Sequence, residues 1–127
     1  MTIEVRREYA QHEETALMDA VHAAVVAAFR IPERDRTVRL IVHAPHRFRV
    51  PPGLAHPECA TVVSIDAFAG RSLDAKRDLF RIMAENLEGL GIPRDHLKVV
   101  IRDVPRENWG LGGRAGSDVE IGFAIEV

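Results

Sequence analysis

One pattern of secondary structure occurs twice along this chain, at an offset of 61 residues. Residues 13–29 have apolar residues at helical spacing, and a shift of 61 residues aligns them with a similar pattern over 72–90. The second pattern begins with Ser72, a potential N-cap. Each helical pattern is followed by the same dipeptide, Ile31-Pro32 in one case and Ile92-Pro93 in the other. Because proline disfavours helix in the residue before it, each pair ends its helix. The chain is therefore predicted to contain two copies of one structural unit.

Strand patterns flank each predicted helix. The first helix lies between weak alternation over 2–7 and a β-branched run over 37–43, and the second lies between runs at 61–68 and 96–102. A helix that connects two strands of one sheet makes those strands parallel. We therefore predict an α/β fold, in which two consecutive β-α-β repeats form one mixed four-stranded sheet with two helices on one face.

Two further strands and an assembly are predicted. A short edge strand is expected at 46–50, and a final strand is expected at 119–127. The two units, about 1–60 and 61–127, are expected to form a single domain of residues 1–127. Because only one face of the sheet carries helices, we expect a neighbouring subunit to cover the other face.

The composition is that of a globular domain and excludes several protein classes. The chain has 127 residues, of which 46% are hydrophobic and 28% charged, with a net charge of −2. Near-neutral charge argues against non-specific nucleic-acid binding, and no apolar run reaches the ~18 residues that a membrane span needs. We expect neither nucleic acid nor membrane as a partner. A single cysteine, Cys59, and the lack of an apolar signal region predict a cytoplasmic location.

The charged side chains favour anion binding over metal binding. Fifteen of the 17 basic residues are arginines, whose planar guanidinium group matches carboxylate and phosphate oxygens, although GC-rich coding would give the same bias. Of the six histidines, His43 and His46 lie three residues apart in a segment expected to be extended, which points them in different directions. No cysteine or carboxylate completes a ligand set. We expect no metal and no cofactor.

Two short motifs accompany the repeats. Gly70-Arg71-Ser72 opens the second helix, and Glu107-Asn108-Trp109-Gly110-Leu111-Gly112-Gly113 precedes the last predicted strand. Together with the two β-α-β units, they resemble the tautomerase superfamily over nearly the whole chain. The similarity is to its longer-chain branch, which includes malonate semialdehyde decarboxylase and cis-3-chloroacrylic acid dehalogenase.

The resemblance implies a homotrimer and a small carboxylate substrate. Members of the superfamily use an N-terminal proline, exposed when the initiator methionine is removed, as a general base or acid. Burial and nearby arginines lower the pKa of its amine, and the arginines also hold the substrate carboxylate.

This chain departs from the family at its N-terminus, because residue 2 is threonine and not proline. Alignment on the strand places Met1 at the position of the catalytic proline. A primary amine there still accepts a proton and forms an imine with a carbonyl compound. Removal of Met1 would expose Thr2 instead.

Two arginines are candidate anion ligands. Arg71 lies at the start of a helix, where a cation is mildly unfavourable with the helix dipole, which favours a functional role over a solvated charge. Arg39 lies within an apolar strand, either paired with an acid on the solvent face or, as the resemblance implies, bound to the substrate carboxylate.

Four other residues are weaker candidates. Trp109 either packs structurally or, as the resemblance implies, forms an apolar wall of the active site. Asp35 either makes a turn contact or corresponds to the aspartate that assists decarboxylation in malonate semialdehyde decarboxylase. Arg106 and Asn108 either reach the substrate or remain solvated.

Two functions follow from these residues, and a further possibility is that a side chain such as Asp35 or a histidine transfers the proton in place of the N-terminal amine. The first is proton transfer on a small carbonyl or enol carboxylic acid, as in a tautomerase or a related decarboxylase or hydratase, with Met1, Arg39, Arg71 and Asp35 as catalytic residues. The second is a non-catalytic binding or assembly protein that keeps the trimeric fold without the catalytic proline.

Overall fold

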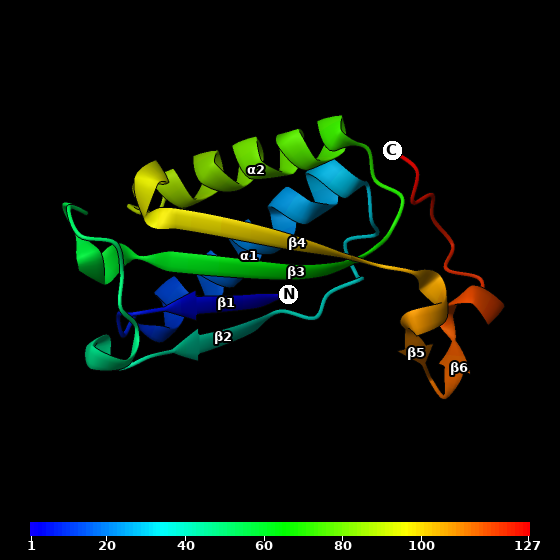
Figure 1. Cartoon of the computed structure of the whole chain (residues 1–127), viewed down its shortest axis with the longest axis horizontal. Coiled ribbons are helices and arrows are strands. Elements are labelled where there is room, and N and C mark those ends of the chain that lie inside the picture. The colour runs from blue at the N-terminus through cyan, green and yellow to red at the C-terminus, as the bar shows by residue number, and fades with distance from the viewer.

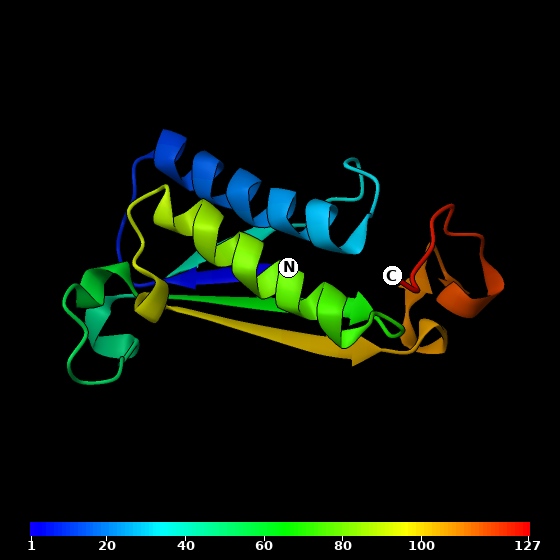
Figure 2. The same ribbon diagram turned by 90° about the horizontal axis from the view of Figure 1, so that it is seen from above.

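The computed structural model describes residues 1–127 and places both helices on one face of a four-stranded sheet (Figures 1 and 2). In spatial order the strands are β2 (Arg39–Val42), β1 (Thr2–Val5), β3 (Thr61–Phe68) and β4 (Leu97–Val104). Strand β1 is parallel to β2 and β3 is parallel to β4, whereas the central strands β1 and β3 are antiparallel. The predicted fold class is confirmed.

The two helices begin with different caps. Helix α1 spans Gln11–Phe29 and starts two residues earlier than predicted, where the Glu13 carboxylate accepts the Ala10 N–H at 3.0 Å. Helix α2 spans Leu73–Glu88, and the predicted cap Ser72 accepts the Ala75 N–H at 3.1 Å. No helix is long and apolar enough to cross a membrane.

The core lies between the helices and the sheet. Alternate strand residues such as Ile3, Val63 and Ile65 point towards the helices and are buried together with Leu79 and Met83. Burying each such side chain contributes about 1.5–3 kcal/mol. This layer fixes the strand ends that carry the candidate site.

The opposite face of the sheet has no helices, as predicted (Figure 2). Its strands expose Ile41 and Val100, which are 43% and 39% accessible. The Arg102 Nε donates to the Asp66 carboxylate at 2.7 Å on the same face. This face therefore combines apolar and charged side chains.

The predicted edge strand at 46–50 is wrong. The chain instead forms a 3-10 helix at Pro45–Arg47. Proline at the first position of a helical turn has a suitable fixed φ and needs no N–H partner. The Arg6 Nε donates to the Pro45 carbonyl at 3.2 Å and holds this turn against the end of β1.

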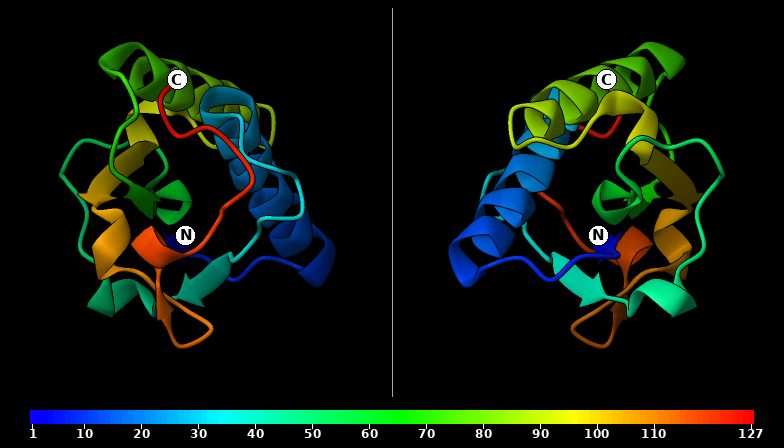
Figure 3. Two further views of the ribbon diagram at one scale, coloured as in Figure 1. Left: turned by 90° about the vertical axis from the view of Figure 1, so that its right-hand side faces the viewer. Right: turned by 90° about the vertical axis from the view of Figure 1, so that its left-hand side faces the viewer.

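The predicted final strand at 119–127 is also wrong, because that segment pairs with no strand. Seen end-on, it arches across the end of the two layers and finishes near the start of α2 (Figure 3). The Ser72 N–H donates to the Val127 carbonyl at 3.1 Å. Alternate residues of the segment are half-buried, so the alternation records one-sided burial without strand pairing.

A small hairpin follows β4, within the glycine-rich stretch. It consists of β5 (Gly110–Leu111) and β6 (Arg114–Ala115). The two residues between them, Gly112 and Gly113, have φ of 60° and 85°. A two-residue hairpin turn with positive φ at both positions favours glycine.

Candidate active site

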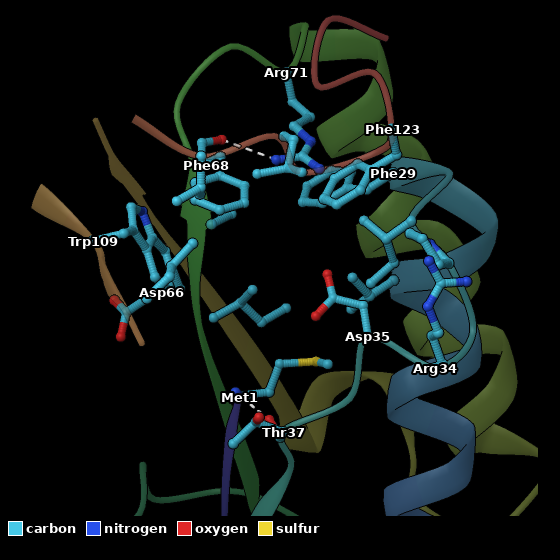
Figure 4. A pocket seen from close by; sticks show the side chains of 18 of the residues that line it. Met1, Phe29, Arg34, Asp35, Thr37, Asp66, Phe68, Arg71, Trp109 and Phe123 are labelled. Carbon is cyan, nitrogen blue, oxygen red and sulfur yellow. Dashed lines mark hydrogen bonds between the residues drawn. The ribbon is translucent and has the colours of Figure 1, made fainter. Parts of the chain in front are cut away.

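A cavity of about 750 Å³ lies at the end of the sheet where β1 begins. Because β3 is antiparallel to β1, the last residues of β3 lie beside Met1. The loop after α1, the segment around Trp109 and the C-terminal segment close the remaining sides (Figures 3 and 4). Four of the predicted site residues line this cavity: Met1, Asp35, Arg71 and Trp109.

The Met1 nitrogen lies at the floor of the cavity and donates to the Thr37 carbonyl at 2.8 Å (Figure 4). Burial lowers the pKa of this amine below its usual 8.0, and the positive charge of Arg39 lowers that pKa further, whereas Asp66 opposes the shift. A neutral amine retains N–H donors for Thr37 and has a lone pair that accepts a proton. The group is therefore suited to act as a base nearer neutral pH.

Arg71 lies at the opposite end of the cavity from Met1 and is only 8% exposed (Figure 4). Its Nη1 donates to the Phe68 carbonyl at 3.0 Å, and its Cζ lies 4.8 Å from the centre of the Phe29 ring. Burial lowers the pKa of the guanidinium group, but arginine stays charged in proteins. Its Nε is buried without a hydrogen-bond partner. The result is a fixed cation with remaining donors at a cavity, which suits a planar anion.

Asp35 presents its carboxylate to the cavity between Met1 and Arg71 (Figure 4). Its backbone N–H donates to the Pro32 carbonyl at 2.9 Å and forms the turn that directs the side chain inward. The charge of Asp35 opposes the lowering of the Arg71 pKa. The cavity thus combines an amine, a carboxylate and a guanidinium group. No group of three or more His, Cys, Asp or Glu side chains lies close enough together to hold a metal ion.

Aromatic side chains form the wall around the guanidinium group. Phe29, Phe68, Trp109 and Phe123 line the cavity and make up four of the seven aromatic residues in the chain. The Trp109 and Phe68 ring centres are 4.8 Å apart, and the Trp109 Nε1 donates to the Val104 carbonyl at 3.2 Å. Apolar walls strengthen the electrostatic interactions inside a site.

The structure does not bring the other predicted site residues into the cavity lining. Arg39 is exposed on the helix-free face of β2 and acts on Met1 through its charge. Arg106 donates to the carbonyls of Gly116 and Val119 at 2.6–3.2 Å, and these bonds hold the C-terminal segment. Asn108 is exposed in a 3-10 helix, outside the lining.

Several cavity residues were missed by sequence reasoning. Asp66 is a charged residue within the otherwise apolar pattern of β3. This interruption is a signal in the sequence, but the sequence alone does not show that Asp66 lies near the Met1 amine. Val119, Ile121 and Phe123 lie in the segment predicted as a strand, and the observed path of that segment makes them part of the cavity lining. Arg34 also lines the cavity and lies beside Asp35 in sequence.

Comparisons with known sequences find one family. Residues 35–112 match the family described as tautomerase enzyme. The 2-hydroxymuconate tautomerase of Comamonas testosteroni is 35% identical over 51 residues, which are 39% of this chain and 81% of the relative. That relative is therefore about half as long as this chain, the length of one β-α-β unit.

Comparisons with solved structures find the same fold over about nine tenths of the chain. The FG41 malonate semialdehyde decarboxylase inhibited by 3-bromopropiolate has a TM-score of 0.80 and 25% identity, covering 91% of each chain. A wild-type fused 4-OT described as an asymmetric trimer has a TM-score of 0.81 and 20% identity, covering 91% of this chain and 94% of its own.

Proposed function

The chain belongs to the family of tautomerase enzymes, and we propose that it moves a proton next to the carbonyl group of a small carboxylic acid. One observation carries this proposal. The Met1 amine, the Asp35 carboxylate and the Arg71 guanidinium group face a single cavity with aromatic walls (Figure 4). These groups supply a base, an acid–base partner and an anion ligand.

Each group has a role that its surroundings support. Arg71 binds the substrate carboxylate through its terminal nitrogens, because its Nε is sealed in the protein. The neutral Met1 amine removes the proton from the carbon beside the carbonyl, and the electron pair moves to the carbonyl oxygen to give an enolate. The resulting ammonium group returns the proton to oxygen or carbon. Trp109 limits access of water to this step.

A decarboxylation uses the same groups. In this reaction the Met1 amine starts in its protonated form. The bond between the carboxylate and the next carbon of a β-keto acid breaks, CO₂ leaves, and the enolate takes a proton from the Met1 ammonium group, which then recovers a proton from water. Asp35 assists by placing negative charge beside the departing group, which favours its conversion to neutral CO₂. Arg39 acts at a distance by keeping the pKa of the amine low.

We also propose that the protein is a homotrimer. A structurally similar fused 4-OT is described as a trimer, and the helix-free face of this sheet leaves Ile41 and Val100 exposed. Light scattering during gel filtration is expected to give three times the mass of the chain. A monomer at micromolar concentration would overturn the trimer but not the cavity chemistry.

The test of the function begins with the N-terminal residue. Intact-mass spectrometry of the native protein identifies whether Met1 or Thr2 carries the amine. A panel of enol, 2-oxo and β-keto acids is then assayed with the native protein and with a variant that has one glycine added before Met1. We expect activity with the native protein and its loss with the extended one, because the added residue displaces the amine from the floor of the cavity.

Equal turnover by the extended protein would overturn the role of the amine. Borohydride treatment during incubation with a carbonyl acid gives a second measure, since an imine at Met1 would be trapped as an added mass on the N-terminal peptide. The matched control is the same treatment of the acetylated protein, which has no free N-terminal amine.

The alternative is a binding protein without turnover. It is favoured by the position of the Met1 side chain, which extends along the cavity floor towards Asp35 and occupies space near the amine (Figure 4). This alternative predicts that carboxylates raise the melting temperature of the native protein although none of the panel is converted. Replacement of Arg71 by Met would remove that stabilisation.

A further inference from the structure

A buried histidine lies outside the cavity, on helix α1. His22 is 2% exposed and follows the buried Val21 in the helix sequence. Its Nε2 lies 2.7 Å from the Glu33 carbonyl, whereas its Nδ1 is buried without a partner. Burying this ring costs free energy, because its Nδ1 loses its hydrogen bond to water and gains none in the protein. A residue with this cost is expected to have a role, and the bond made by its other nitrogen is a candidate for that role.

The contact determines which ring nitrogen carries the hydrogen. A backbone carbonyl only accepts hydrogen bonds, so the His22 Nε2 must be the donor to Glu33. The unpartnered nitrogen is then Nδ1. The ring therefore makes one directed bond from the core to the chain that leaves α1.

That chain carries much of the candidate site. Glu33 lies in the loop between α1 and β2, two residues before Asp35 and four before Thr37. Asp35 presents its carboxylate to the cavity, and the Thr37 carbonyl accepts from the Met1 nitrogen. Figure 2 shows this loop at the end of α1 that lies towards the C-terminal segment.

A second contact between the loop and α1 lies at the surface. The Arg36 Nη1 lies 3.4 Å from the Asp19 carboxylate, and both side chains are about half exposed. A solvent-exposed pair of this kind contributes little, whereas a buried hydrogen bond is harder to replace with water. The His22 bond is the stronger of the two ties.

We propose that His22 is a positioning residue, whose buried bond to the Glu33 carbonyl holds the loop so that Asp35 and the Thr37 carbonyl stay at the cavity. Its catalytic consequence rests on the proposed function. The hydrogen bond between His22 and Glu33 does not depend on the proposed function, because it concerns only the position and mobility of the loop.

The first test measures the hydrogen bond between His22 and Glu33 and needs no substrate. Long-range ¹H–¹⁵N correlation of the native protein is expected to show the His22 hydrogen on Nε2. Replacement of His22 by Phe keeps a planar ring and removes the donor. We expect exchange of the Asp35 amide, which is bonded to Pro32, to become about tenfold faster in this variant.

Two matched variants separate positioning from general loss of stability. His22→Gln restores a donor at a similar reach and is expected to return exchange close to the native rate. Asp19→Asn removes only the exposed tie, one turn away on the same helix, and is expected to change the rate by less than twofold. A hydrogen on Nδ1, or unchanged exchange in folded His22→Phe, would overturn the proposal.

Turnover supplies the catalytic readout where the panel finds a substrate. His22→Phe is expected to lower kcat about tenfold with little change in KM, because Arg71 still binds the carboxylate. Leu17→Ala, a core change distant from the loop, serves as a control of reduced stability and is expected to leave kcat unchanged. Equal kcat values for His22→Phe and the native protein would overturn the catalytic consequence. Lack of turnover in every protein would instead count against the proposed function.

Discussion

The two ends of the sheet are related by the internal repeat, yet the matching residues of the two units differ in charge, and the cavity that Asp35 lines is at one end. Asp35 and His96 occupy matching turns, since their N–H groups donate to the carbonyls of Pro32 and Pro93 at 2.9 and 3.0 Å. Asp35 presents a carboxylate to the cavity. His96 is instead 4% exposed and accepts the His56 N–H at 3.0 Å. The same turn places a side chain at the cavity at one end and a buried ring at the other.

The other elements of the site differ in the same way. At the offset of 61 residues, the helix start that carries Arg71 matches Ala10, and the strand start that carries Met1 matches Val62. Neither counterpart has a charged side chain or a free amine. The two units therefore share one backbone arrangement. They differ at the positions of Met1, Asp35 and Arg71, which line the candidate site at one end of the sheet only.

The largest expected effect comes from removing the charge that most distinguishes the two ends. Arg71→Met is expected to lower kcat/KM about 100-fold, because a hydrogen bond to a charged group contributes about 1.5–3 kcal/mol. Steady-state kinetics on the best substrate of the panel measures the loss. The matched control is Arg77→Met, an exposed arginine on the same helix that pairs with Asp74.

Arg71 also supports the Phe68 carbonyl, so Arg71→Lys is the second variant. It retains the charge and is expected to recover part of the activity. If both variants keep activity within threefold of the native protein, while Arg77→Met does the same, the anion is bound elsewhere and the two ends differ less than proposed.

Substitutions in the two matching turns should have different effects, one on activity and the other on stability. Asp35→Asn is expected to lower kcat by about tenfold without a fall in Tm, because the carboxylate has no hydrogen-bond partner within the protein to lose. His96→Ala is expected to lower stability by about 2–3 kcal/mol with kcat unchanged, since it removes a buried ring and its hydrogen bond to the His56 N–H. Thermal unfolding and kinetics on both variants give the comparison. Loss of activity in His96→Ala at a temperature where it is folded would contradict it.

The repeat made most of the fold predictable. The four main strands, both helices, Ser72 as a cap and the helix-free face follow from periodicity and from the parallel pairing that a crossover helix requires. The two wrong strands, at 46–50 and 119–127, have the right alternation or composition but no neighbouring strand. Pairing depends on the path of distant segments, which a local pattern does not contain.

The site was predictable in part, for a similar reason. Arg71 and Trp109 lie in the two motifs of the family resemblance, whereas Met1 and Asp35 were predicted from the positions that the resemblance implies. The structure brings all four to one cavity. Asp66 joins them only because β3 runs antiparallel to β1, a relation that the local sequence leaves open. His22 is not among the residues that the helical pattern places on the buried face, so neither its burial nor its bond to the Glu33 carbonyl was predicted.

The pH dependence of activity tests the amine. Because a protonated amine is no base, kcat/KM is expected to rise with pH through a pKa that lies below 8.0. Arg39→Met removes a charge that lowers this pKa and should move the rise to higher pH, whereas Asp66→Asn should move it to lower pH. Lys98 lies on β4, on the same helix-free face of the sheet as Arg39. Lys98→Met is therefore the matched control and should leave the pH profile unchanged. Shifts of the opposite sign would show that another group titrates.

The same pKa shift has a consequence for stability. The folded amine binds fewer protons than the unfolded amine between the lowered pKa and 8.0, so the free energy of unfolding should increase with pH in that window. Arg39→Met should reduce the increase. Denaturant unfolding at several pH values, compared with the acetylated protein, isolates this contribution.

The smallest expected effect concerns the residue before each Ile-Pro pair. Arg30 and Gly91 match at the offset of 61 residues, and both have positive φ, 54° and 90°. Only glycine adopts this conformation without steric cost, so the first half accepts strain that the second avoids. Arg30→Gly is expected to stabilise the protein by up to about 1 kcal/mol, and Gly91→Ala to destabilise it by about 1 kcal/mol. A Cβ at Gly91 meets nothing within 4 Å, so the loss comes from the backbone alone.

Thermal unfolding is expected to show opposite Tm changes of about 3–4 °C for the two variants. Gly89→Ala is the control, because Gly89 has φ of −60° and accepts a side chain without this strain. If Arg30→Gly instead lowers Tm, the Arg30 side chain stabilises the loop that carries Asp35 by more than the strain it imposes. The first half would then support its site through a charged side chain, at the position where the second half needs only a glycine.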